Sequence, residues 1–302
     1  MRIQAEFLAF LALKFFISLL PRSWCLALGR SLGTLAFYLD GRHRRIALRN
    51  LRTAFGGQKG PAEFRAIARA SFRHFGQVMI DILKLFHYER SKIEELVAVE
   101  GWENLVNAIR LGKGVLLFSA HFGNWEIGSV IISKAVKLNV IARALDNELI
   151  EAELVRFRQR MGGHVIYKQQ AAREVLRALR NREAVAILVD QNVLRVQAVF
   201  VDFFGRPAGT TPVLGAFALR TEAPLVPAYC LPVASGRYLL KILPPPAIAP
   251  DKDVGTNVLK ITQTCTKIIE NEIRENPGFW LWFHDRWRSR PKEEHDHQDD
   301  TP

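Results

Sequence analysis

The residues best suited to chemistry lie in the stretch LLFSAHFGNWEIGS, residues 117–130. His121 follows one apolar run, and Glu126 stands five positions later, at the start of another. A continuous helix would point these two side chains apart, because only three- and four-residue separations share a helix face. A strand, a turn at Gly123 and a helix capped by Asn124 would fold the imidazole back onto the carboxylate. The pattern predicts a general base, since a carboxylate that accepts one ring N–H raises the basicity of the other nitrogen.

The sequence offers this base no nucleophile from the protein. It contains no G-x-S-x-G turn and no cysteine near His121, and no turn would expose Ser119. The base would then activate a hydroxyl group of a substrate, or a water molecule. A purely structural histidine is the alternative, but the strand end and the companion Glu126 favour catalysis. No further ligands stand at a fixed offset, so we expect neither a metal nor another cofactor.

The elements that must position this pair alternate between strand and helix patterns. Short apolar runs predict strands at 114–120, 138–145, 164–168, 183–190, 224–232 and 238–244. Helical spacing predicts helices at 61–88, 147–163, 171–181, 209–221 and 257–275. The alternation indicates an α/β fold with a mostly parallel central sheet and helices on both faces. In such sheets, sites form at the carboxyl ends of the strands.

The chain begins with an apolar segment, residues 5–39, which Pro21 and Arg22 divide into two helices. Its first run is shorter than the roughly 20 residues of a full span. We expect residues 1–40 to form a membrane anchor, either a pair of helices that dips into one leaflet or a single tilted span. Buried core helices are the alternative. The α/β domain would follow over residues 41–290, and the charged residues 291–302 would form a disordered tail.

The 302-residue chain carries 42 Lys and Arg against 30 Asp and Glu, a net charge of +12 that favours acidic partners. Five arginines follow the apolar start, at positions 42, 44, 45, 49 and 52, where each would add about 1 kcal/mol on an anionic membrane. A solvated helix face is the alternative, and no nucleic-acid recognition module is visible, so we expect no nucleic-acid partner. In FWLWFHDRW, residues 279–287, Trp280 and Trp282 would pack in the core or at the headgroups. The predicted membrane or anion contacts are Arg42, Arg44, Arg45, Arg286 and Arg288.

HFGNWE has the H-x4-D/E form of the glycerolipid acyltransferase superfamily, and further motifs narrow the resemblance. The chain resembles the bacterial lipid A biosynthesis acyltransferases of the lauroyl/myristoyl group. The resemblance covers Arg42 to Trp287, with one departure, Arg143-Ala144 where the family often has Arg-Pro. The motifs that carry it are RNL and AFG within 49–56, GVLLFSAHFGNWE, ARALDN at 142–147, RMGG at 160–163, VDQN at 189–192, VDFFGRPAGTTP at 201–212, LVPAYC, and FWLWFHDRW.

The resemblance implies acyl transfer from acyl carrier protein or acyl-CoA to a hydroxyl group of a membrane glycolipid, with a lipid A precursor as the first candidate. His121 would take the proton of the acceptor hydroxyl, and Glu126 would orient the imidazole. The basic surface would steer the acidic carrier protein by charge. The chain would work at the inner membrane, with its catalytic domain on the cytoplasmic side.

Several other residues are candidates for substrate binding. Arg143 would stabilise the oxyanion or a headgroup phosphate, unless it forms only a structural ion pair. Asp190 and Gln191 end another strand and would bind hydroxyl groups of the acceptor, unless they only cap a turn. A predicted junction of strand and helix at 203–212 would bind an anion through free N–H groups. The residues expected there are Arg206, Thr210 and Thr211, although N-capping alone would explain Thr211.

Other functions share these features. The acceptor could be a phosphatidylinositol mannoside-like glycolipid, an ornithine lipid or a lysophospholipid. A thioesterase or esterase could use the same pair of residues on water. A membrane or nucleic-acid binder without catalysis is supported only by the pI of about 9.9 and the arginine cluster.

Overall fold

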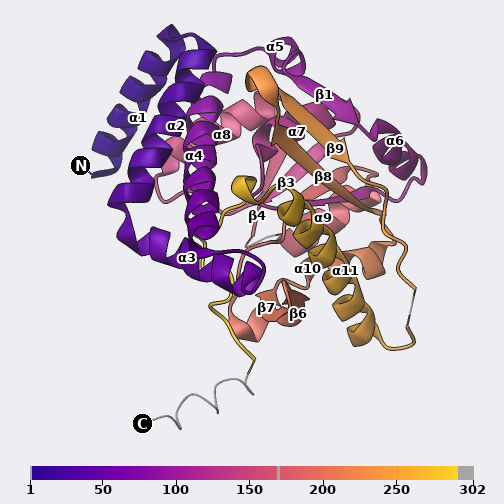
Figure 1. Ribbon diagram of the computed structural model, residues 1–302. Coiled ribbons are helices and arrows are strands. Elements are labelled where there is room, and N and C mark those ends of the chain that lie inside the picture. The colour runs from indigo at the N-terminus through magenta and orange to yellow at the C-terminus, as the bar shows by residue number, and fades with distance from the viewer. Residues whose placement is uncertain (1, 169–170, 250, 292–302) are drawn as a thin grey trace.

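The computed structural model describes residues 2–168, 171–249 and 251–291 (Figure 1). The predicted tail, residues 291–302, therefore lies outside the described residues except for Pro291. The apolar start forms two helices that separate at Pro21, as predicted. The four N-terminal helices are α1 (Arg2–Leu19), α2 (Arg22–Leu39), α3 (Gly41–Phe55) and α4 (Pro61–Leu85).

A seven-stranded sheet forms the centre of the described chain, in the order β1-β9-β8-β2-β5-β3-β4. Five neighbouring strands, β8 to β4 in that order, run parallel, whereas β9 is antiparallel to β8 and β1 is parallel to β9. The mostly parallel sheet predicted from the sequence is confirmed. The strands are β1 (Val97–Glu100), β2 (Val115–Ser119), β3 (Leu138–Ala142), β4 (Gly163–Tyr167), β5 (Ala184–Leu188), β8 (Leu225–Pro232) and β9 (Tyr238–Ile242).

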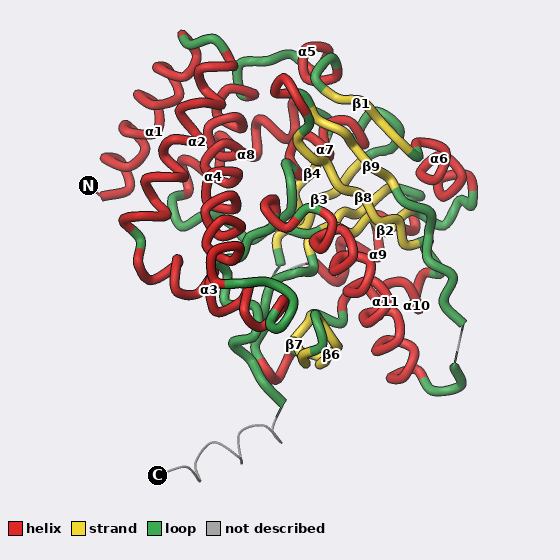
Figure 2. Tube along the Cα trace, in the orientation of Figure 1, coloured by secondary structure: helices red, strands yellow, loops and turns green. Residues whose placement is uncertain are grey.

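Helices cover both faces of the sheet, as Figure 2 shows. Alternation along β2 explains why, because successive side chains of a strand point to opposite faces. Leu116 and Phe118 join one apolar core and Val115 and Leu117 the other. The helices that pack into the first core include α9 (Ala171–Arg180), α10 (Val213–Thr221) and α11 (Val254–Glu275). Those that pack into the second include α5 (Arg90–Glu94), α6 (Trp102–Arg110), α7 (Trp125–Ile132) and α8 (Glu148–Arg160).

The N-terminal helices belong to this packed structure. Ile17, Leu26 and Phe37 are buried. Glycines let α2 approach α4 closely, since a Cβ at Gly33 would lie 2.1 Å from the carbonyl oxygen of Phe72. Among the described residues, no helix combines the length and apolar character that crossing a bilayer requires. The predicted tilted span is therefore not supported.

A two-stranded hairpin replaces the predicted junction of strand and helix at 203–212. Antiparallel strands β6 (Val199–Phe203) and β7 (Arg206–Thr210) meet at Phe204 and Gly205, which both have positive φ. Helix α10 begins after this hairpin with Pro212 as its N-cap, so the prediction that Thr211 caps it is wrong. Short 3-10 helices lie at Arg195–Gln197, Ala234–Gly236 and Pro277–Phe279.

Candidate active site

The turn between β2 and α7 carries His121 at the carboxyl edge of the sheet. Gly123 in this turn has φ 69°, and a Cβ there would lie 2.1 Å from the carbonyl oxygen of Cys230. Only glycine fits that conformation and that contact. The side chain of Asn124 accepts a hydrogen bond from the N–H of Ile127 at 3.3 Å, which confirms the predicted helix cap. The turn is therefore fixed on both sides of His121.

His121 is paired with Asp190, which follows the neighbouring strand. β2 and β5 are parallel, with Ser119 opposite Leu188, so the residues two positions beyond each of them meet. The Nδ1 of His121 lies 2.9 Å from Oδ1 of Asp190, and the backbone N–H of His121 donates to Oδ2 at 2.9 Å. Since Asp190 is ionised, we assign the ring proton to Nδ1, which leaves the lone pair on Nε2.

The Asp190 carboxylate is held in its ionised form. Burial alone would raise its pKa, but electrostatic attraction to His121 and hydrogen bonds from His121 and Trp280 outweigh burial and lower the pKa below its ordinary value. The indole Nε1–H of Trp280 donates to Oδ2 at 2.8 Å. Trp280 lies in the segment FWLWFHDRW, 90 residues after Asp190 in the chain, and the sequence did not link this tryptophan to the site.

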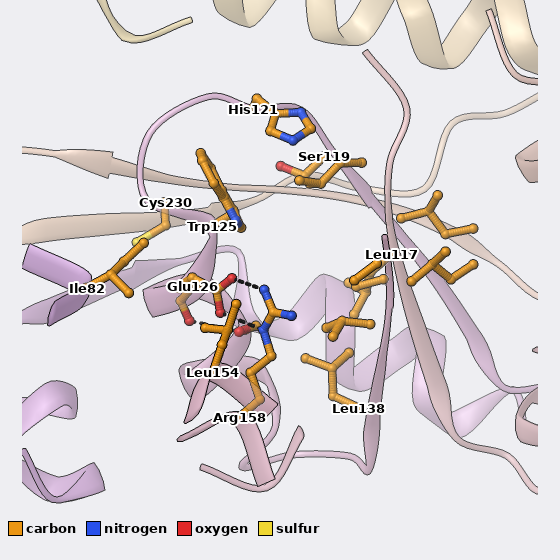
Figure 3. A pocket seen from close by; sticks show the side chains of 18 of the residues that line it. Ile82, Leu117, Ser119, His121, Trp125, Glu126, Leu138, Leu154, Arg158 and Cys230 are labelled. Carbon is orange, nitrogen blue, oxygen red and sulfur yellow. Dashed lines mark hydrogen bonds and ion pairs between the residues drawn. The ribbon is translucent and has the colours of Figure 1, made fainter. Parts of the chain in front are cut away.

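Glu126 has a different partner from the one expected. In the described residues it forms no hydrogen bond with His121, and its carboxylate is instead paired with Arg158 of α8 (Figure 3). The Nε of Arg158 donates to Oε2 at 3.1 Å, and Nη2 contacts Oε1. Glu126 lies in the first turn of α7, from which its side chain points toward α8. The predicted hydrogen bond between His121 and Glu126 is therefore wrong for this structure.

A cavity of about 580 Å³ lies beside His121. Its volume falls within the range of roughly 300–1,000 Å³ typical of small-molecule sites. The lining is mainly aliphatic and aromatic, which suits a hydrocarbon chain, and residues that contribute to it include Phe10, Ile82, Phe86, Leu138, Leu154 and Ala186. The ionisable side chains that line it are His121, Glu126, Arg143, Arg158, Lys168 and Cys230.

Three residues of the cavity wall carry a hydroxyl or thiol group, Ser119, Ser129 and Cys230. The hydroxyl of Ser129 donates to the backbone carbonyl of Glu126 at 2.8 Å. Burial raises the pKa of the Cys230 thiol far above its ordinary range, so the reactive thiolate is not formed. Ser119 ends β2, and no hydrogen bond joins its hydroxyl to His121 in the described chain. His121 therefore has no activated nucleophile of the protein beside it.

Two predicted binding residues lie near this base. The amide nitrogen of Gln191 is 3.4 Å from Nε2 of His121. Arg143 lines the cavity, is largely exposed, and its Nη2 lies 3.3 Å from a carboxylate oxygen of Asp146. Asp190, predicted to bind hydroxyl groups of the acceptor, instead holds the base, so that prediction is wrong.

The predicted anion site at 203–212 is not formed as expected. Arg206 and Thr211 lie on or beside β7, with Arg206 exposed. The hydroxyl of Thr210 is buried, donates to the carbonyl of Ala208 at 3.0 Å and accepts from Nη2 of Arg286. Arg286 is 1% exposed and donates to the carbonyl of Gly209 at 2.7 Å, so the prediction that it faces anions is wrong. Burial lowers the pKa of Arg286 to about 10.

The remaining basic residues divide between structural and exposed roles. Arg44 donates to the carbonyls of Phe37 and Tyr38 at 2.9 and 2.7 Å and so caps the end of α2. This contact gives Arg44 a structural role of its own. Solvent-exposed positions are occupied by Arg42, Arg45 and Arg288. Trp280 and Trp282 are buried in the core.

His74 of α4 is a further site residue that the sequence did not reveal. Its Nε2 lies 3.2 Å from the carbonyl oxygen of Gly123, directly behind the His121 turn. Burial lowers the pKa of His74 to about 4, so the ring is neutral and donates this hydrogen bond near neutral pH. No signal in the sequence singled out His74, because it shares the buried face of α4 with other polar residues, Ser71, Asp81 and Lys84.

A buried acid, an imidazole with its lone pair on Nε2 and an adjoining apolar cavity fit a lipid acyltransferase. Sequence comparison gives the particular family. The profile described as bacterial lipid A biosynthesis acyltransferase matches residues 1–289, and the chain belongs to this family.

The relatives of the chain include enzymes with different lipid acceptors. It is 27% identical to a lipid A biosynthesis palmitoleoyltransferase of Escherichia coli (strain K12), with 87% of this chain and 85% of the relative aligned. It is 26% identical to the lipid A biosynthesis lauroyltransferase of the same strain, over 90% and 88% of the two chains. It is 25% identical to a phosphatidylinositol mannoside acyltransferase of Mycobacterium tuberculosis (strain ATCC 25618 / H37Rv), over 72% and 69%.

Proposed function

We propose that the chain transfers a fatty acyl group from acyl carrier protein, or from acyl-CoA, to a hydroxyl group of a lipid A precursor. The observation that carries this proposal is the hydrogen-bonded pair of His121 and Asp190 beside an apolar cavity. The pair supplies a base and the cavity suits a hydrocarbon chain. The relatives named for lipid A synthesis support this acceptor, whereas the mycobacterial relative supports a phosphatidylinositol mannoside as the alternative.

The chemistry follows from the protonation state of the pair. Nε2 of His121 accepts the proton of the acceptor hydroxyl while the hydroxyl oxygen attacks the thioester carbonyl. Asp190 stabilises the imidazolium that forms. When the tetrahedral intermediate collapses, the C–S bond breaks and Nε2–H returns the proton to the leaving thiol. The ester product and the free thiol leave His121 in its starting state.

The charged residues that line the cavity can bind the polar groups of the substrates. Arg143 and Lys168 are exposed side chains that also line the cavity, so they can contact phosphates of the lipid headgroup or of the donor. Arg158, fixed by Glu126, places a guanidinium in the cavity wall below His121 in Figure 3. We assign Glu126 the role of holding Arg158 and give the orientation of His121 to Asp190.

We also propose that the exposed apolar face of α1 and α2 lies in the membrane interface. Large side chains there remain in solvent, including Phe15 at 65%, Leu19 at 66%, Trp24 at 67% and Leu39 at 75% exposure. Burying such a face in the headgroup region is favourable without any helix crossing the bilayer. A glycolipid acceptor could then enter the site from the inner membrane, with the catalytic domain on the cytoplasmic side.

The decisive experiment supplies acyl carrier protein or acyl-CoA donors and candidate glycolipids, and measures acylated lipid and free fatty acid separately. His121→Ala should lose about 10²–10⁴-fold in acyl transfer, because general-base catalysis is lost. Ser119→Ala, two residues away, is the matched control and should stay near wild type, because the lipid supplies the nucleophile. Release of fatty acid without any need for lipid would refute the transferase and indicate a thioesterase.

A further inference from the structure

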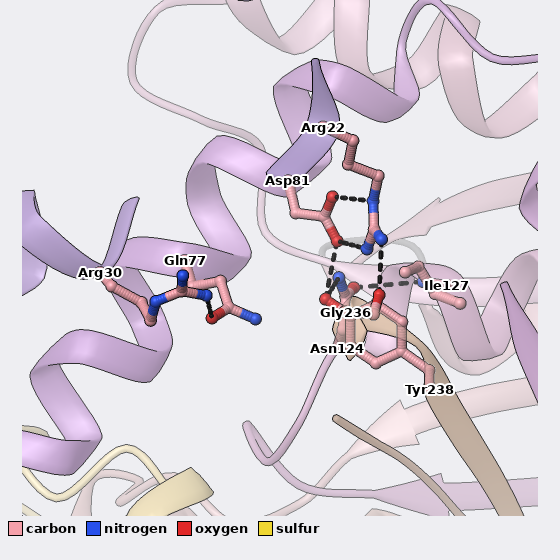
Figure 4. A network of polar contacts seen from close by, with 8 residues as sticks. All are labelled: Arg22, Arg30, Gln77, Asp81, Asn124, Ile127, Gly236 and Tyr238. Atoms are coloured by element: carbon pink, nitrogen blue, oxygen red, sulfur yellow. Dashed lines mark hydrogen bonds and ion pairs between the residues drawn. The ribbon is translucent and has the colours of Figure 1, made fainter. Parts of the chain in front are cut away.

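A buried ion pair joins the start of α2 to the middle of α4. Arg22 donates from Nε to Oδ1 of Asp81 at 2.8 Å and from Nη2 to Oδ2 at 2.7 Å. The side chain of Asp81 is fully buried and that of Arg22 is 11% exposed. A third donor of Arg22, Nη1, reaches the carbonyl of Gly236 at 2.5 Å, just before β9 (Figure 4). One arginine thus links α2, α4 and the loop before β9.

The same carboxylate extends the contact toward the catalytic turn. The hydroxyl of Tyr238 on β9 donates to Oδ2 of Asp81 at 2.7 Å. The amide nitrogen of Asn124 lies 3.4 Å from that hydroxyl, while the amide oxygen caps α7. Asn124 stands three residues after His121, on the same turn. Figure 4 shows Arg22, Asp81, Tyr238 and Asn124 as one continuous set of contacts.

Stability alone does not explain this set. The free energy needed to remove two charges from water is often as large as the electrostatic attraction gained between them. An apolar pair in the same place can therefore give an equally stable protein. α2 and α4 already meet closely through glycines: a Cβ at Gly29 would lie 2.6 Å from the Cα of Gln77. What an apolar contact cannot supply is direction. Asp81 accepts three hydrogen bonds, two from Arg22 and one from Tyr238. Burial raises the pKa of the Tyr238 hydroxyl, which keeps its proton for donation.

We propose that Tyr238, held by Asp81 and Arg22, is a positioning residue for the turn that carries His121. The Tyr238 hydroxyl orients the Asn124 side chain. Asn124 in turn fixes the start of α7, which follows the turn that carries His121. Because Arg22 is the first residue of α2, the position of that helix contributes to the orientation of the His121 ring. The effect on turnover rests on the proposed acyl transfer, whereas the effect on the imidazole does not.

Tyr238→Phe tests the proposal, because it removes only the hydroxyl and leaves the ion pair in place. Tyr229→Phe is the matched control: Tyr229 is equally buried on the adjacent strand β8, and in the described chain its hydroxyl has no hydrogen-bond partner. We expect Tyr238→Phe to lower kcat about fivefold to thirtyfold with KM unchanged, which corresponds to the loss of one hydrogen bond. Tyr229→Phe should stay within about twofold of wild type. Unfolding midpoints of both variants establish that the samples are folded.

A second readout does not depend on any substrate. Nitrogen-15 NMR of histidine-labelled protein follows the ring nitrogens of His121, which are assigned with His121→Ala. The Tyr238→Phe variant should shift or broaden these signals, and the Tyr229→Phe variant should not. Equal kcat values and unchanged His121 signals in both variants would overturn the proposal. If wild type shows no acyl transfer, the proposed function fails, and the NMR comparison alone decides the positioning role.

Discussion

Replacing Asp190 with asparagine should disable the base by reversing the tautomer of His121. The carboxylate accepts three N–H groups: Nδ1 of His121 on Oδ1, and the backbone N–H of His121 and the indole of Trp280 on Oδ2. An amide has one acceptor oxygen and one donor group. Its oxygen will take the Oδ2 position, because the opposite orientation would direct the amide N–H₂ at two buried donors. Each buried donor left without an acceptor costs about 1–3 kcal/mol of stability.

The amide N–H₂ then faces Nδ1, which must become the acceptor, and the ring proton moves to Nε2. Nε2 can no longer take a proton from a lipid hydroxyl. We expect acyl transfer to fall by about 10²–10⁴-fold, the range known for general bases and for catalytic aspartates replaced by asparagine. The unfolding midpoint should change little, because both contacts on the Oδ2 side are retained. The acylated glycolipid is quantified by mass spectrometry, and nitrogen-15 NMR reports the tautomer.

Glu126→Gln is the informative comparison. It weakens the buried pair with Arg158, so it should lower stability, since removing one partner of such a pair can cost about 3–5 kcal/mol and a neutral amide retains part of it. It should leave the tautomer of His121 unchanged. The reasoning is refuted if Asp190→Asn keeps more than a tenth of the activity, or if Glu126→Gln alone reverses the tautomer.

Three further predictions concern stability, chain length and the membrane. His74 has a pKa lowered from 6.5 to about 4, so the unfolded chain binds its proton first as the pH falls, and stability declines between pH 6.5 and 4 by up to about 3 kcal/mol. His74→Phe should flatten that part of the pH profile in urea unfolding, and an unchanged slope would contradict the assignment. Ala186→Phe narrows the cavity and should cut kcat/KM for the longest acyl donors about tenfold more than for short ones, whereas a uniform loss would place the chain elsewhere. Trp24→Ser should weaken co-sedimentation with phosphatidylglycerol vesicles. Leu111 is 62% exposed on another part of the chain, so Leu111→Ser should not weaken it. Equal binding of the two variants would refute the proposed interface.

Local features of the fold followed from the sequence because they depend on neighbours along the chain. Pro21 divides the first two helices, Asn124 caps α7, and apolar runs mark the central strands. The hairpin of β6 and β7 was missed even though Phe204-Gly205 forms a short turn with positive φ. Pro207 obscured it, since proline is rare inside sheets and is tolerated at edges such as this one.

The partner of His121 could not be obtained in this way, because it depends on the order of the strands. Strands β3 and β4 lie between β2 and β5 along the chain, yet β5 is the neighbour of β2 in the sheet. The sequence alone does not give this order of strands. Once β2 and β5 are neighbours with Ser119 opposite Leu188, the meeting of His121 and Asp190 follows from counting. Arg286 was misjudged for a similar reason, since its burial depends on β7, a strand the sequence had not predicted.

The five-residue spacing of His121 and Glu126 gains a different physical meaning from the structure. The histidine must stand on the turn, at the sheet edge, to meet Asp190. The glutamate must stand in the first turn of α7, where the helix dipole favours a negative charge, to meet Arg158. One short segment therefore supplies both the base and an anchor for the cavity wall. A change of spacing would separate His121 from the cavity that we propose for the acyl chain, even if neither residue were altered.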